Sequence, residues 1–168
     1  MIPQNDRDLT PAQRATLQRA MDELGPRLQE LRNLLHIHIV DRAEREGWSK
    51  SQAQWLDSFA EVPFLELILS NVPAREALER AYAQARSQLA EAYFVKALED
   101  GKSRLTAFLT VIALERQIAE RKGEPPVEYP DEWLQQAAES VEVAAAAGAP
   151  PQEQLVRGFE TLQEIATA

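Results

Sequence analysis

The 168-residue sequence contains no cysteine and only six glycines. The absence of cysteine excludes disulfide bonds, thiolate metal ligands and a cysteine nucleophile. No apolar run approaches the roughly 20 residues that a membrane-spanning helix needs, and the first residues lack the basic and apolar regions of a signal peptide. We therefore expect a cytoplasmic protein that does not bind a membrane.

The sequence also lacks the signatures of common enzyme classes. It has neither a glycine-rich phosphate loop nor a Gly-x-Ser-x-Gly nucleophile turn. Its two histidines, His36 and His38, would point about 200° apart on a helix, so they cannot bind one metal from one face, and we expect one packed and one solvated. Carboxylates such as Asp131 and Glu132 are neither paired with a histidine nor placed at a metal-ligand spacing, and they suit a helix start. We expect no enzyme activity, no metal and no cofactor.

What the sequence does contain is a helix-forming composition. Hydrophobic residues make up 45% of the chain and charged residues 27%, with a bias towards alanine, leucine, glutamate, glutamine and arginine. The alternation of apolar and polar residues that is typical of strands is almost absent. The sequence predicts an all-α fold.

Helix start and stop signals divide the chain into three expected parts. Thr10-Pro11 begins the first helix, Gly25-Pro26 ends or bends it, and Pro63 interrupts the chain after the third helix. The parts are an N-terminal helical domain (1–62), a central antiparallel helical hairpin (63–123) and an acidic C-terminal segment (124–168). A proline-rich linker opens the last part, and two short helices follow it.

Two apolar stripes mark the central hairpin, which turns at Asp100-Gly101-Lys102. Each arm carries apolar residues at helical steps of three and four. Neither arm can bury such a face alone, so we expect the arms to pair and to leave apolar surface for another copy of the chain. The stripes predict a homo-oligomer whose interface includes Leu78, Tyr82, Leu89, Phe108 and Ile112.

The net charge of −9 lies almost entirely in the last quarter of the chain. Residues 1–52 carry 8 basic and 8 acidic side chains, residues 53–123 carry 9 and 10, and residues 124–168 carry 1 and 9. The first three quarters are nearly neutral and can still present a local basic face to nucleic acid. The acidic last quarter is a candidate segment for binding a protein partner.

Residues 39–59 have the skeleton of a helix-turn-helix. Ala43 lets two helices approach, Gly47 takes the turn, and Trp48 begins a set of apolar residues that lock the second helix on the first. Lysine and serine bind phosphates at such a position, and glutamine reads adenine edges. The DNA-binding side chains on this interpretation are Lys50, Ser51, Gln52 and Gln54. A plain capped helical corner generates the same Gly-x-Ser pattern, and the sequence leaves both interpretations open.

The order of these features resembles that of phage small terminase subunits and their prophage relatives. The resemblance rests on Gly47-Trp48-Ser49-Lys50-Ser51, Trp55-Leu56, the stretch 77–86 rich in alanine, glutamate and arginine, and Ala97-Leu98-Glu99-Asp100-Gly101 leading to 106–109, which together span about half of the chain. It implies an N-terminal domain that binds packaging-site DNA, a central hairpin that assembles a ring, and a C-terminal segment that engages the large motor subunit.

The sequence leaves two main functions open. The first is a non-enzymatic, oligomeric protein that recognises double-stranded DNA. The alternative is an acidic helical adaptor, inhibitor or regulatory subunit that binds protein and no nucleic acid, which the net acidity and the absence of an arginine-rich stripe favour. A ligand-binding helical bundle would need convergent polar groups in a pocket, and the sequence identifies none.

Overall fold

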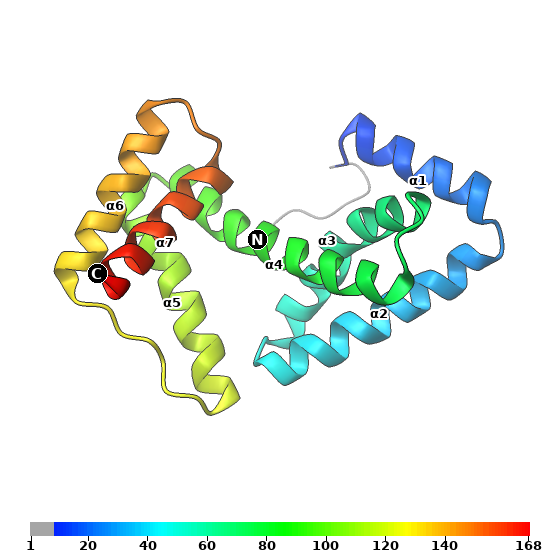
Figure 1. Cartoon of the computed structure of the whole chain (residues 1–168), viewed down its shortest axis with the longest axis horizontal. Coiled ribbons are helices and arrows are strands. Elements are labelled where there is room, and N and C mark those ends of the chain that lie inside the picture. Colours follow the sequence, from blue (N-terminus) through cyan, green and yellow to red (C-terminus); the bar gives the residue numbers. More distant parts are fainter. Residues whose placement is uncertain (1–8) are drawn as a thin grey trace. The chain divides into compact units, whose positions relative to one another are not determined.

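The computed structural model of the chain describes residues 9–168, which form seven α-helices (Figure 1). The helices are α1 (Pro11–Leu24), α2 (Arg27–Glu46), α3 (Lys50–Leu69), α4 (Ala74–Glu99), α5 (Arg104–Lys122), α6 (Asp131–Ala146) and α7 (Pro151–Thr167). The described residues form no strand, which confirms the all-α fold. None of the described helices combines the length and the apolar character required to cross a bilayer. The expectation of no signal peptide rests on residues 1–8, which lie outside the described part of the chain.

Local capping signals set most helix ends where the sequence predicted them. The Thr10 hydroxyl accepts a hydrogen bond from the Gln13 backbone at 3.1 Å, and the Gln13 side chain accepts one from the Thr10 backbone at 2.9 Å. This reciprocal pair is a capping box, which satisfies two otherwise unpaired donors at the start of α1. Gly47, with a φ of 91°, closes α2 in the left-handed conformation that glycine adopts without strain.

α3 is longer than expected because Pro63 does not end it. The helix runs over Lys50–Leu69 with Pro63 in its interior, whereas the sequence predicted an interruption there. An interior proline costs roughly 3 kcal/mol, since it removes a backbone hydrogen bond and crowds the preceding turn. Phe64 and Leu65 are both 0% exposed, and burying each stabilises the fold by roughly 1.5–3 kcal/mol. Their burial offsets the cost of the proline.

The chain forms two compact units, one ending at Leu89 and the other spanning Ala90–Ala168. We call them the N-terminal unit and the C-terminal unit. Their boundary falls within α4, so this helix contributes residues to both. This division differs from the three parts expected from the sequence, because α5 buries its apolar face with α6 and α7 instead of forming a separate hairpin domain with α4.

The core of the N-terminal unit is built from helix faces with the expected period. α1, α2 and α3 pack on one another. The buried side chains of α2 recur at steps of three and four: Leu28, Leu31, Leu35, Ile39 and Ala43. α3 and the first part of α4 add side chains that are at most 1% exposed: Leu56, Ala60, Phe64, Leu65, Ala77, Ala81 and Tyr82.

The core of the C-terminal unit combines the end of α4 with α5, α6 and α7. Its buried members are Phe94, Ala97, Ala107, Phe108, Val111, Ile112, Ala137, Val141, Leu155 and Leu162. Tyr129 and Trp133 pack against this core, so the proline-rich connection between α5 and α6 is anchored to it. The apolar surface of α5 that was expected to meet another copy is therefore covered by α6 and α7 of the same chain.

Candidate functional site

The corner between α2 and α3 is a capped turn. The Gly47 backbone N–H bonds to the carbonyls of Ala43 and Glu44, and the Trp48 N–H reaches the Ala43 carbonyl at 3.0 Å. Ser49 then caps α3, since its hydroxyl accepts from the Gln52 backbone at 3.2 Å. The Gly-x-Ser pattern is explained by these bonds, because they pair the backbone groups that the end of α2 and the start of α3 would otherwise leave unpaired.

α2 and α3 contact each other far from the corner, which favours a helical hairpin, and the helix-turn-helix interpretation of 39–59 stays a prediction. His36 Nδ1 lies 2.7 Å from Asp57 Oδ2, and Arg32 Nε lies 2.6 Å from Glu61 Oε1. Arg32 is about 22 Å along α2 from the corner and Glu61 about 18 Å along α3, at 1.5 Å per residue. Helices crossing at 90–120° would separate these positions by about 20–28 Å. Their direct contact favours a helical hairpin.

The four predicted DNA-binding residues fall into two groups. Lys50, Ser51 and Gln54 are exposed at the start of α3. Gln52 is 6% exposed, and its side-chain oxygen accepts a hydrogen bond from the Ser49 backbone at 2.9 Å. The prediction for Gln52 is therefore corrected: its side chain completes the capping box and is not directed at a ligand.

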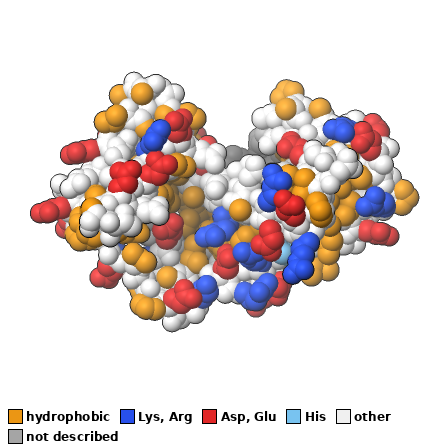
Figure 2. Space-filling model, in the orientation of Figure 1, with side chains coloured by type: hydrophobic (Ala, Val, Ile, Leu, Met, Phe, Trp, Pro, Cys, Tyr) orange, Lys and Arg blue, Asp and Glu red, His pale blue; other side chains and the backbone are white. Residues whose placement is uncertain are grey.

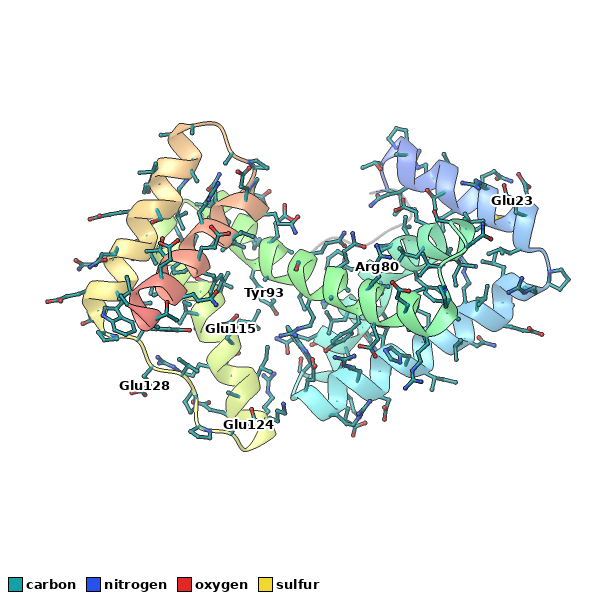
Figure 3. The ribbon with its side chains drawn as sticks, in the orientation of Figure 1. Glu23, Arg80, Tyr93, Glu115, Glu124 and Glu128 are labelled. Carbon is teal, nitrogen blue, oxygen red and sulfur yellow. The ribbon has the colours of Figure 1, made fainter. Side chains whose placement is uncertain are left out.

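The positive charge of the N-terminal unit is largely neutralised by neighbouring carboxylates. Six of its arginines lie within 4.0 Å of a carboxylate oxygen: Arg19, Arg32, Arg42, Arg45, Arg80 and Arg86. Arg80 of α4 (Figure 3), for example, is 3.6 Å from Glu76. Electrostatic attraction to phosphates normally dominates binding to DNA. Arginines that are already paired with carboxylates attract phosphates only weakly.

A buried polar network ties the Trp48 corner to α4. The Tyr82 hydroxyl donates to the Glu46 carboxylate and accepts from the Trp48 indole N–H at 3.1 Å. The Arg42 guanidinium lies 4.8 Å from the centre of the Tyr82 ring and pairs with Glu79. Burial, followed by the hydrogen bond to Glu46, raises the pKa of Tyr82, and the hydrogen bond from Arg42 lowers the pKa of Glu79. The corner is thus part of the core of its own chain.

Replacing Tyr82 with phenylalanine tests this network. The change leaves the Trp48 N–H and the Glu46 carboxylate without their shared partner, so we expect a loss of about 1–3 kcal/mol of unfolding free energy in urea denaturation. Tyr129→Phe is the control, because no hydrogen bond to the Tyr129 hydroxyl forms among the described residues. Equal urea midpoints for the two variants would show that the network does not stabilise the fold.

The predicted interface side chains are buried within one chain. The exposed fractions are 8% for Leu78, 1% for Tyr82, 0% for Leu89, 0% for Phe108 and 5% for Ile112. Intrachain packing therefore accounts for the apolar stripes without a second copy. An oligomer would have to form through other residues, unless the helices first separated and exposed these side chains.

His36 and Asp57 form a histidine–carboxylate pair that the sequence analysis did not predict, because the partners are 21 residues apart. They line a small cavity of about 290 Å³ together with Ser58 and Glu61. The His36 side chain is 62% exposed, and no hydrogen bond links it to Ser58. The pair therefore does not contact the Ser58 hydroxyl, which it would have to do to activate it as a nucleophile. Residues 9–168 contain no group of three or more histidine, aspartate or glutamate side chains that could hold a metal.

A groove of about 890 Å³ lies in the C-terminal unit. We call it the α6–α7 groove. It is lined by α6 from Gln136 to its C-terminal cap residue Ala147, by the turn at 148–150 and by α7 from Glu153 to Glu164. Each bank spans 12 residues, and the helical rise between its first and last residue is about 16 Å, or three turns. Its size suits a peptide segment.

Small residues let α6 and α7 approach closely enough to form this groove. On the inner side Gly158 faces the core, and an added Cβ there would lie 2.6 Å from Phe108 Cε2 and 2.9 Å from Val141 Cγ2. On the outer side the hydroxyls of Ser140 and Thr161 meet at 2.6 Å. The inner faces make the core, and the outer faces are left as the walls of the groove.

The groove combines an apolar floor with acidic banks. Val143 lines it and is 70% exposed, and several alanines lie beside it. The acidic lining residues are Glu139, Glu153, Glu160 and Glu164. Glu160 is 3.3 Å from Arg157, whereas the other three have no ion-pair partner among residues 9–168. Figure 2 shows acidic side chains spread over the α6 and α7 surface, with little positive charge.

The sequence located the partner-binding candidate in 124–168 but did not predict the groove. Composition reveals the acidity, whereas the groove depends on the register between two helices. Comparison of the chain with protein-family models, with curated proteins and with solved structures found no significant match.

Proposed function

We propose that this protein is a non-enzymatic protein-binding module, an adaptor or regulatory subunit, whose C-terminal unit receives the partner. The observation that carries this proposal is the unpaired negative charge of the α6–α7 groove. Six arginines of the N-terminal unit are paired with carboxylates, whereas Glu139, Glu153 and Glu164 in the α6–α7 groove have no ion-pair partner among the described residues. The protein presents unpaired negative charge beside exposed apolar surface, which is typical of a site for a cationic protein segment.

The competing proposal is the DNA-recognition oligomer implied by the resemblance to small terminase subunits. It would use Lys50, Ser51 and Gln54, which are exposed. Three features weaken it: the α2–α3 contacts that favour a hairpin, the use of Gln52 in a cap, and the burial of the expected oligomer interface. We therefore favour the protein-binding function.

Two measurements separate these functions. The first is fluorescence anisotropy of labelled double-stranded DNA titrated with the protein and with a Lys50→Ala/Gln54→Ala variant. We expect no specific binding with either.

The second measurement is photocrosslinking in cells from a photoreactive amino acid that replaces Val143 in the groove. The control places the same photoreactive amino acid at position 37 of α2, because Ile37 is 67% exposed. We expect a discrete protein adduct at Val143 and none at Ile37. DNA binding that the double variant abolishes, without an adduct at Val143, would contradict the proposal.

A further inference from the structure

The chemistry of the α6–α7 groove specifies its occupant, and this inference rests on the proposed function. We infer that the groove binds a cationic amphipathic helix of a partner protein, about three turns long, with basic residues along both edges of its apolar face.

The length and floor of the groove favour a helix. Its banks extend about 16 Å, which matches roughly 11 residues of a helix at 1.5 Å per residue. Its apolar lining consists of small or short side chains, including Val143, Ala144 and Ala147. Small residues allow a third helix to approach two antiparallel helices closely and to place apolar side chains at i, i+3, i+4 and i+7 between them.

The carboxylates define the polar edges of the occupant. Glu139 lies on α6, and Glu153, Glu160 and Glu164 lie on α7, so both banks are acidic. Ser140 faces Thr161 across the groove, which puts Glu139 and Glu164 towards one end, whereas Glu153 lies about 12 Å from Thr161 towards the other. Arg157 of α7 also lines the groove and pairs with Glu160. A partner with lysine or arginine on both flanks would therefore meet the unpaired carboxylates at the two ends of the groove, whereas an acidic partner would be repelled.

Among residues 9–168, no helix of another copy combines a positive excess with an exposed apolar face. α2 carries four basic and four acidic residues, and α4 carries four of each. α5 has a positive excess, with four basic and two acidic residues, but its apolar face, including Phe108, Val111 and Ile112, is buried in the C-terminal core. Charge complementarity therefore favours a different protein as the partner.

The test uses the full-length protein and a fluorescent synthetic helix of about 15 residues, a length slightly greater than the groove. Alanine and leucine form the apolar face of this peptide, and lysine and arginine flank it. In a control peptide glutamate replaces every basic residue. We expect the cationic peptide to bind at least tenfold more tightly than the acidic one, and its binding to weaken as salt is added.

Three variants locate the binding. Glu139→Lys/Glu164→Lys reverses charge on both banks, and we expect about a tenfold loss of affinity. Ala144→Trp fills the floor, and we expect a similar or larger loss. Glu128→Lys, on the segment between α5 and α6 (Figure 3), makes the same kind of charge change outside the groove, and we expect less than a twofold loss. Circular dichroism confirms that each variant is folded, and the charge reversals alter exposed positions only.

These experiments test the identity of the occupant separately from the proposed protein-binding function. Equal binding of the two peptides, or equal affinities of the groove variants and Glu128→Lys, overturns the inference. If Val143 photocrosslinks to a protein but the cationic peptide does not bind, the occupant is wrong while the protein-binding function stands. If neither occurs, both fail. Sedimentation that shows dimers dissociated by Glu139→Lys/Glu164→Lys would identify another copy as the occupant and overturn the inference.

Discussion

Gly158→Val is expected to destabilise the C-terminal unit by about 3 kcal/mol or more. Even the first added carbon would lie 2.6 Å from Phe108 and 2.9 Å from Val141, whereas carbon atoms pack at about 3.5–4.0 Å. Phe108 is 0% exposed and its ring centre lies 5.2 Å from that of Phe159, so it has little room to move. For a unit of this size, thermal denaturation should show a melting temperature lower by more than about 10 °C.

A double-mutant cycle shows whether the clash is the cause. Gly158→Ala adds a single carbon, and its gain in helix propensity of roughly 1 kcal/mol offsets part of the overlap, so it should destabilise less than valine. Phe108→Leu in the Gly158→Val background should recover stability beyond the sum of the single changes, because it removes the overlapping ring. Strict additivity, or a wild-type melting temperature for Gly158→Val, would refute close helix packing at this position.

Ending the chain at Gly123 is expected to unfold what remains of the C-terminal unit. The truncation removes Ala137, Val141, Leu155 and Leu162 from a core that also contains Phe108 and Val111. The remaining apolar residues of α5 would face water, and the short end of α4 cannot cover them. Far-ultraviolet circular dichroism should show a loss of helix larger than the 16 and 17 residues of α6 and α7, because α5 unfolds as well.

Adding back the missing segment provides the control. A peptide corresponding to 124–168, mixed with the truncated chain, should restore helicity by rebuilding the core. If the truncated chain instead kept all of its remaining helix and melted cooperatively, residues 124–168 would be an independent segment, as the three-part division of the sequence implied.

The helix boundaries could be predicted because their causes are local. The capping box at Thr10, the left-handed Gly47 and the cap at Ser49 all depend on residues within a few positions of one another. Pro63 is the exception, since its local cost is offset by the burial of Phe64 and Leu65. Such burial depends on distant parts of the chain, which local signals do not report.

The candidate site could be predicted by region but not by geometry. Composition placed the candidate segment for a protein partner in 124–168, and the α6–α7 groove lies in the same range, whereas the binding of a partner stays a prediction. The apolar stripes were identified correctly as buried faces, but a buried side chain such as Phe108 has the same pattern whether another copy or the same chain covers it. Likewise, the cap formed by Ser49 and Gln52 suits a hairpin as well as a recognition helix. The α2–α3 pairs at Asp57 and Glu61, which favour the hairpin, join residues too far apart in the sequence to be predicted from local signals.

The placement of the tryptophans makes the two units optically distinguishable. Trp48 is 9% exposed in the N-terminal unit, hydrogen-bonded to Tyr82, and Trp55 of the same unit stacks on Phe59 at 6.3 Å. Trp133 packs against the core of the C-terminal unit. With Trp48 and Trp55 replaced by phenylalanine, the remaining emission comes from Trp133 and follows the C-terminal unit alone. Intrinsic fluorescence can thus assign an unfolding transition to one half of the chain without any added dye.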